Sequence, residues 1–167
     1  LRKGGDALDI TLLDAERDRI AAYLNDRGYF DFTVNNISYD VDTLGHPYRA
    51  DVHMIIRPTL TGYDERGVPE WEDNAIYRLR NINVYPTYDP MLRSTTGFKP
   101  GAIIDTTYRS GLTIIRDLGM RPQLRPSILR HTIPLYPNYI YNSEQVTRTY
   151  NELMALGFFR NAKIDRK

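Results

Sequence analysis

The sequence of 167 residues contains no cysteine, which excludes disulfides, thiolate metal sites and a cysteine nucleophile. It has no apolar run near the roughly 18 residues that a helix needs to cross a bilayer. The N-terminal stretch LRKGGDALDI lacks the apolar segment of a signal peptide. Charge of one sign is not in excess either, because 22 Lys and Arg stand against 21 Asp and Glu. The overall charge of +1 therefore gives no reason to expect a nucleic-acid partner.

Motifs of catalysis and metal binding are also missing. The sequence has no G-x-S-x-G elbow, no HExxH and no glycine-rich phosphate loop. Its three histidines, His46, His53 and His131, have no partner at helical spacing. Asp40, Asp42, Gly45 and Asp51 match part of a calcium-loop spacing, but no helices flank them and an ordinary turn explains them better. We predict a protein that is not an enzyme and that holds no metal or cofactor.

Tyrosine is abundant, with 13 Tyr beside 5 Phe and 1 Trp. Tyrosine is favoured in strands and at contact surfaces, so this composition favours a sheet-containing binding module. Together with 41% hydrophobic and 26% charged residues, it is typical of a globular protein.

Two helices are expected, over 14–27 and 143–156. In the first, Asp14 is the expected N-cap and apolar residues recur at helical spacing up to Leu24. In the second, Ser143 or Asn142 is the expected cap. The residues expected on its buried face are Val146, Tyr150 and Leu153.

The two helices end alike, in the phrases GYF (28–30) and GFF (157–159). A glycine stops a helix by entering the left-handed conformation, and the residue after it packs back on the last turn. This ending pairs Tyr29 with Leu24, and Phe158 with Leu153. The doubled cap, leucine, glycine and aromatic pair indicates a repeated module.

Strands are expected around each helix. Phe30, Phe32 and Val34 alternate after the first helix, and a turn at 42–47 leads to a second strand whose residues share one face. These residues are Ala50, Val52, Met54 and Ile56. Residues 61–75 are polar and rich in turn formers, which predicts a linker or loop. A further strand is expected over 75–86, and the stretches GAIIDTTY and GLTIIRDL favour strands within 87–125. A short helix is expected from Pro126 to His131.

A family resemblance rests on these phrases. The stretch PLYPNYIYNSEQVTRTYNELMALGFFRNAKI resembles the C-terminal half of a POTRA domain, and AERDRIAAYLNDRGYFDF resembles the same half of a preceding unit. Such units belong to outer-membrane β-barrel assembly proteins of the BamA and TamA type. The elaborated stretch 87–125 is more similar to Bacteroidetes-like surface antigens than to the simple POTRA pattern.

The resemblance implies an α+β fold of tandem POTRA-like units, each with two helices packed on a small mixed three-stranded sheet. Residues 1–60 would be the C-terminal part of one unit and 61–75 a linker. Residues 76–167 would be a second unit with an insertion at 87–125 and its last strand missing. Both chain ends are therefore expected to be truncated.

The resemblance also implies a location and partners. The units would lie on the periplasmic side of the outer membrane of a Gram-negative bacterium, beneath a C-terminal barrel of the same protein. Their partners would be unfolded outer-membrane proteins or accessory assembly subunits, bound by addition of a strand to an open sheet edge.

The expected open edges are the strands that follow each glycine, Phe30–Tyr39 and Phe158–Ile164. The candidate residues on them are Phe30, Phe32, Val34, Phe158, Arg160, Ala162 and Ile164. A competing interpretation is that charges such as Arg160 guard an exposed edge against aggregation. Trp71, in a polar stretch, would either anchor a partner or pack under its own loop.

An alternative function stays open, namely an aromatic-rich periplasmic module that binds glycan or peptidoglycan. Tyrosine and tryptophan side chains gathered on one concave face would favour it over a sheet edge. The client, the choice between insertion and export, and the number of units are not determined by the sequence.

Overall fold

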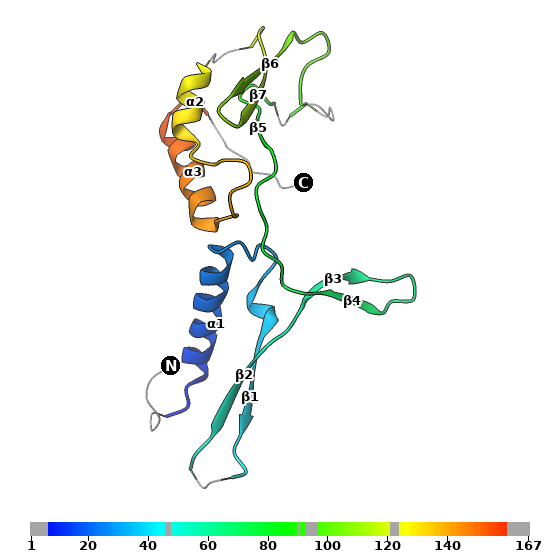
Figure 1. Ribbon diagram of the computed structural model, residues 1–167, viewed down its shortest axis with the longest axis vertical. Helices are drawn as coiled ribbons and strands as arrows, with labels where there is room; N and C mark the ends of the chain where they lie inside the picture. The colour runs from blue at the N-terminus through cyan, green and yellow to red at the C-terminus, as the bar shows by residue number, and fades with distance from the viewer. Residues whose placement is uncertain (1–6, 46–47, 90, 93–96, 121–123, 160–167) are drawn as a thin grey trace. The chain divides into compact units, whose positions relative to one another are not determined.

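The structure is a computed structural model that describes residues 7–45, 48–89, 91–92, 97–120 and 124–159. The chain forms two compact units, Leu1–Tyr77 and Arg78–Lys167 (Figure 1). Both combine helix with small sheets, so the expected α+β class is confirmed. No helix among these residues is long and apolar enough to cross a membrane.

The described residues of the first unit form one α-helix, one 3-10 turn and two separate antiparallel hairpins. Its elements are α1 (Ile10–Asn25), η1 (Val34–Asn36), β1 (Ile37–Asp42), β2 (Asp51–Ile56), β3 (Thr59–Tyr63) and β4 (Pro69–Glu72). Strand β1 pairs with β2, and β3 pairs with β4. The second hairpin occupies residues that the sequence predicts as a linker or loop.

Helix α1 begins earlier than its sequence suggests. Its N-cap is Asp9, whose carboxylate accepts a hydrogen bond from the Thr11 N–H at 2.9 Å. The expected cap Asp14 instead lies within the helix and pairs with Arg17 at 3.1 Å. The prediction that Asp14 caps the helix is wrong, because Asp9 offers the same capping oxygen one turn earlier.

The end of α1 follows the expected pattern. Gly28 has φ +98°, a conformation that costs a glycine little because it has no Cβ. The Tyr29 N–H then donates to the Leu24 carbonyl at 3.1 Å, which is the closing bond of a Schellman ending. Tyr29 and Leu24 both pack on the same small core.

That core is formed by α1 and the segment leading to β1. Ala21, Phe32 and Ile37 are buried at its centre. The partly buried side chains around it are Ile20, Leu24, Tyr29, Val34 and Tyr39. Every member comes from α1, the segment between α1 and η1, η1 or β1, so β2 contributes none of the residues of this core.

In the part of the second unit that the structure describes, there are a mixed three-stranded sheet and two helices. Its elements are β5 (Ile82–Val84), β6 (Ile104–Arg109), β7 (Leu112–Asp117), α2 (Pro126–Thr132) and α3 (Ser143–Ala155). The strand order is β5-β7-β6, with β7 parallel to β5 and antiparallel to β6. Residues 87–125, expected as an insertion, therefore supply two of the three strands.

The core of this unit joins β7 to the region around both helices. Its buried residues are Leu112, Ile114, Leu124, Leu129, Ile133 and Leu135. Val146 and Leu153 of α3 pack on it, as expected from the sequence. Tyr150, which the sequence places on the same face, is exposed, and the buried residue of α3 is Thr149. Thr149 lies inside because its hydroxyl donates to the Gln145 carbonyl at 2.7 Å.

The ends of α3 agree with the sequence in part. Asn142 is its N-cap and accepts from the Gln145 N–H at 2.8 Å. Gly157 has φ +69° and stops the helix. Phe158, expected to pack on Leu153, is 54% exposed, and Phe159 packs on the core in its place.

Candidate functional site

Strand β2 is the most open element of the first unit. All six of its residues are exposed, although Val52, Met54, Ile55 and Ile56 are apolar. Among the described strands it pairs with β1 alone, so its other edge is free. An apolar strand with an open edge is a template for pairing with another chain, and proteins ordinarily shield such edges.

The hydrogen-bond pattern shows which groups of β2 point outward. The Arg57 N–H donates to the Asn36 carbonyl at 2.8 Å. Arg57 and Asn36, which lie opposite each other, are therefore a hydrogen-bonded pair of the antiparallel ladder. In an antiparallel ladder such pairs alternate with pairs that do not bond each other. The register pairs His53 with Asp40 and Ile55 with Ser38, which therefore bond across the hairpin. The backbone groups of Val52, Met54 and Ile56 thus face the free edge.

The same three residues share one face of the hairpin. Their cross-strand partners are Val41, Tyr39 and Ile37, in that order. Partner side chains lie on one side of a sheet. Ile37 and Tyr39 pack on the core that α1 helps to form, while their partners on β2 stay exposed. One half of this apolar face is therefore covered and the other half is open.

The predicted edge at Phe30, Phe32 and Val34 is not a strand. Thr33 and Asn36 form a reciprocal capping box that folds residues 34–36 into the 3-10 turn η1. Phe32 is buried in the core at 3% exposure, and Phe30 packs edge-on against Tyr77 with ring centroids 5.6 Å apart. The strand begins only at Ile37, so the prediction of a strand from Phe30 is wrong.

The second predicted edge lies largely outside the described residues. Arg160, Ala162 and Ile164 fall in this part of the chain, so their proposed roles stay predictions. Phe158 is described, and it lies in a bend after α3 rather than in a strand. Its exposed ring is not engaged with the core of the second unit.

Trp71 lies on β4, in a hairpin rather than a loop. It pairs across the strands with Leu60, and Tyr63 pairs with Pro69. A bulge between Leu60 and Gly62 keeps these four side chains on one face. Trp71 is 53% exposed and Tyr63 66% exposed, so Trp71 does not pack under its own loop.

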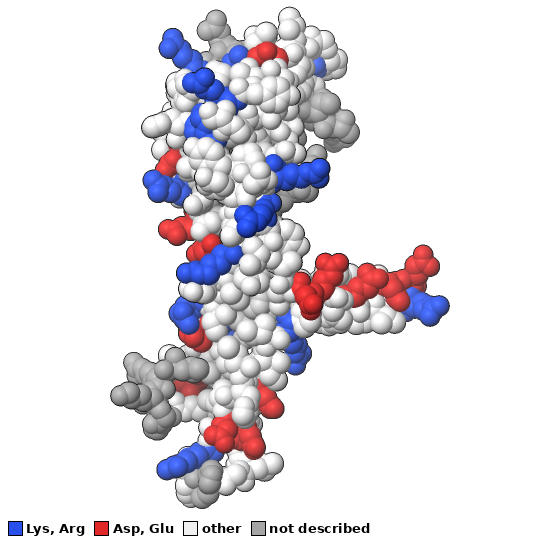
Figure 2. Space-filling model, in the orientation of Figure 1, with Lys and Arg blue, Asp and Glu red and all other residues white. Residues whose placement is uncertain are grey.

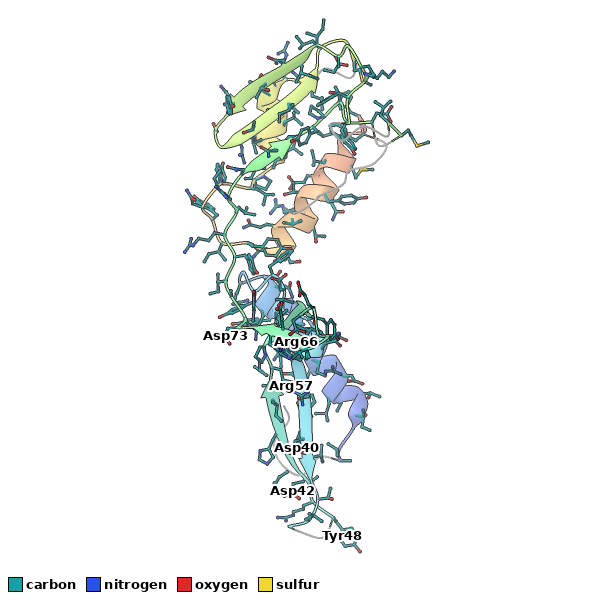
Figure 3. The ribbon with its side chains drawn as sticks, turned by 90° about the vertical axis from the view of Figure 1, so that its right-hand side faces the viewer. Asp40, Asp42, Tyr48, Arg57, Arg66 and Asp73 are labelled. Carbon is teal, nitrogen blue, oxygen red and sulfur yellow. The ribbon has the colours of Figure 1, made fainter. Side chains whose placement is uncertain are left out.

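A polar cluster joins the base of the β3–β4 hairpin to the rest of the first unit. The buried amide of Asn36 donates to the Thr59 hydroxyl at 2.9 Å and to the Arg57 carbonyl at 3.2 Å. Asn74 accepts from the same Thr59 hydroxyl at 2.8 Å and donates to the same carbonyl at 3.1 Å. Figure 3 shows Arg57 and Asp73 near this base, with Tyr48 at the far end of the β1–β2 hairpin.

The segment after β4 closes the unit along the C-terminal turn of α1. The Tyr77 N–H donates to the Gly28 carbonyl at 2.8 Å. A hydrogen bond to Asp31 raises the pKa of Tyr77. A hollow of about 10 Å³, lined by Tyr29 and Tyr77 among others, lies beside it. That volume suits one water molecule, so this hollow is too small for a sugar ring.

On the covered half of the hairpin face, Tyr39 has a buried hydroxyl. Burial raises the pKa of this phenol, with the nearby Glu16 carboxylate adding to the effect. The hydroxyl has no hydrogen-bond partner among the described residues. It is therefore a polar group that weakens the covered half of the face.

Comparison with protein-family models, with curated proteins and with solved structures finds no match for this chain. Its function is therefore inferred from the geometry of the strand edge. The sequence does contain a signal for that edge, since Val52, Met54 and Ile56 alternate along one strand. Alternation alone does not reveal that β2 lies outside the core.

Proposed function

We propose that the chain is a binding module that captures extended polypeptide segments by strand addition along β2. The observation that carries this proposal is the free edge of β2, where the outward backbone groups and the exposed apolar side chains belong to the same residues, Val52, Met54 and Ile56. An added strand would pair with these groups and extend the apolar face that Ile37 and Tyr39 begin.

The exposed side chains of β2 favour a particular residue pattern in the bound segment. A segment that alternates apolar and polar residues would place its apolar side chains beside those of β2 and its polar ones toward water. Strands of outer-membrane barrels have this alternation. The proposal therefore includes the wider role expected from the resemblance, which is a POTRA-like module of a barrel-assembly or translocation protein. The module would act on the periplasmic side of the outer membrane, on unfolded barrel proteins or accessory subunits.

The second unit supports the POTRA-like part of this proposal. Its two helices and mixed three-stranded sheet are the kinds of element that the resemblance implies for one unit. The sheet receives two of its strands from a hairpin between β5 and α2, which the simple POTRA order does not include. The proposal therefore treats this unit as an elaborated relative of the simple pattern.

The test is an amide chemical-shift titration with a peptide of alternating apolar and polar residues, whose pattern copies that of a barrel strand. The proposal expects the largest shifts at Val52, Met54 and Ile56, and smaller ones at His53 and Ile55, whose amides bond across the hairpin. Shifts confined to the second unit, or none at millimolar peptide, would contradict strand addition at β2.

A pair of variants separates backbone pairing from side-chain contact. Met54→Pro removes an N–H that faces the free edge and leaves the β1–β2 ladder complete, as proline on an edge strand does. Met54→Ile keeps both the N–H and an apolar side chain. We expect peptide affinity to fall about tenfold or more in the proline variant, since a hydrogen bond is lost and the ring blocks approach. Equal affinity in the two variants would rule out pairing through residue 54.

A further inference from the structure

The two units carry net charges of opposite sign, which almost cancel in the whole chain. Counted from the sequence, residues 1–77 hold 8 Lys and Arg and 15 Asp and Glu, a net charge of −7. Residues 78–167 hold 14 Lys and Arg and 6 Asp and Glu, a net charge of +8. Charge separated in this way favours association between unlike units.

The acidic charge is dense on the β3–β4 hairpin. Figure 2 shows a row of acidic side chains over this hairpin. The acidic residues of the hairpin and its C-terminal end are Asp64, Glu65, Glu70, Glu72 and Asp73, and the one basic residue there is Arg66. These charges accompany the exposed apolar face of Leu60, Tyr63, Pro69 and Trp71. We call this combination the acidic arm.

The acidic arm is fixed to the rest of the first unit at its base. Thr59 at the start of β3 is bonded by Asn36, and Asn74 beyond β4 is bonded to both Thr59 and Arg57. Its turn is closed by Asp64, which accepts from the Val68 N–H at 2.8 Å. A fixed hairpin with an exposed aromatic side chain loses little entropy when it docks.

The second unit carries a matching surface. Arg78 and Arg80 flank Leu79, whose side chain packs on the core, so the two arginines point the other way along this extended segment. Arg78 donates to the Asn138 carbonyl at 2.9 Å. Beside them lie the exposed rings of Tyr136 and Tyr139, with centroids 5.4 Å apart.

One further residue completes this surface. Ile140 is 44% exposed and forms a bridge with Arg78. The guanidinium of Arg130 lies 4.2 Å from the centre of the Tyr136 ring and donates to the Leu135 carbonyl at 3.0 Å, so it supports this ring from within the unit. Together, Arg78, Arg80, Tyr136, Tyr139 and Ile140 form what we call the cationic-aromatic patch.

We propose that the acidic arm of one chain docks on the cationic-aromatic patch of a second copy. Trp71 and Tyr63 would lie against Tyr139 and Ile140, and Glu65, in the exposed turn next to β3, would face Arg80. Aromatic and arginine side chains are the groups that dominate such contacts. This contact is separate from strand addition at β2, and either can fail without the other.

The contact joins two different surfaces, so it is heterologous. Each chain would keep one unused arm or patch, and copies would add head to tail until a ring closes or a short filament forms. Because exposed charges are screened by salt, association would be strong at low ionic strength and weak above it.

Trp71 makes the test direct, because it is the single tryptophan of the sequence. Sedimentation velocity and tryptophan emission are measured together over a range of protein concentration, in 50 mM and 500 mM NaCl. The proposal expects species larger than one chain and an emission shift to shorter wavelength as concentration rises in low salt, and loss of both in high salt. A monomer at every concentration, with constant emission, would overturn it.

Charge variants identify the surfaces. Glu65→Lys on the arm should abolish association in low salt, whereas Asp18→Lys, which makes the same change of charge on α1, should leave it. Arg80→Glu on the patch should also abolish it. Mixing the Glu65→Lys chain with the Arg80→Glu chain should restore association, because the lysine then faces the glutamate. Association that survives Glu65→Lys, or a mixture that stays monomeric while each chain remains folded by circular dichroism, would contradict the proposed pairing.

Discussion

The two units differ in how much of their sheet is covered. In the second unit, β7 runs between two other strands, and its Leu112 and Ile114 are almost fully buried. In the first unit, no strand has two strand neighbours among the described residues, and β2 is exposed along its whole length. The central strand of the second unit is therefore covered, as in an ordinary small domain, whereas β2 of the first unit is exposed to solvent.

The difference follows from how many elements share each core. Strand β7, α2, α3 and the segments around them contribute to the core of the second unit, whereas one helix and one strand provide most of that of the first. Helix α1 packs on β1 and leaves β2 uncovered, so half of the apolar face stays open. Strand β2 and the acidic arm, both proposed as binding surfaces, therefore lie in the unit whose strands are less covered.

The largest expected effect contrasts a covered strand with the open one. Ile114→Ala, at a fully buried position of β7, should lower the free energy of unfolding by about 2–5 kcal/mol. Met54→Ala, on β2, should cost less than about 1 kcal/mol, because its side chain is already 45% exposed. Urea unfolding followed by circular dichroism gives both values. Similar losses in the two variants would mean that β2 is covered in solution.

The next effect concerns the base of the acidic arm. Asn36→Ala removes the amide that bonds Thr59 and Arg57, and should cost about 1–3 kcal/mol. Asn35→Ala is the matched control, since Asn35 is exposed and its backbone N–H, which bonds Thr33, is kept. Thermal unfolding measures stability, and the anisotropy of Trp71 emission reports on the arm. An arm that stays equally rigid in both variants would show that this cluster does not hold it.

A smaller effect tests the second unit at the start of α3. Asn142→Ala removes the N-cap oxygen that accepts from the Gln145 N–H, and should cost about 1 kcal/mol. Asn151→Ala changes the same residue type at an exposed position within α3 and should be nearly neutral. If the control costs as much as the cap variant, the loss in Asn142→Ala is not due to capping, since alanine within a helix should not destabilise it.

The smallest effect lies on the covered half of the first hairpin. Tyr39→Phe removes a buried hydroxyl that has no partner among the described residues, and should raise the free energy of unfolding by up to about 1 kcal/mol. Tyr23→Phe, at an exposed position, is the control. A destabilised Tyr39→Phe protein would show that the hydroxyl is bonded in solution.

The ionisation of Tyr39 also makes the free energy of unfolding depend on pH. Burial holds the pKa of Tyr39 above its ordinary value of 10.0 in the folded state. The unfolded chain therefore releases this proton first as the pH rises. The stability that depends on the neutral phenol is present below pH 10 and is lost as the pH rises through the folded pKa. Tyr39→Phe should lose less stability than the wild type over that range.

Local signals predicted the ends of the helices well. Gly28 and Gly157 both stop a helix in the left-handed conformation, and Asn142 caps α3. These features depend on a few adjacent residues, so the sequence contains the information needed. Asp14 failed as a cap because Asp9, one turn earlier, was equally suitable and stood before more helix-forming residues.

Features that depend on distant contacts were not predicted. The alternation of Phe30, Phe32 and Val34 suggests a strand, but the side chains of Thr33 and Asn36 bond the backbone and turn it instead. The polar stretch around Trp71 forms a hairpin because Asn36 and Asn74 fix its base, across 15 or more residues of sequence. The openness of β2 likewise depends on which strands α1 covers.

The most direct test of the free edge is native-state hydrogen exchange of the amides of β2. We expect fast exchange at Val52, Met54 and Ile56 and slow exchange at His53 and Ile55, with the fast amides becoming protected when a strand-forming peptide is added. Equal protection at all five positions in the free protein would contradict a free edge, because the edge would then already be paired.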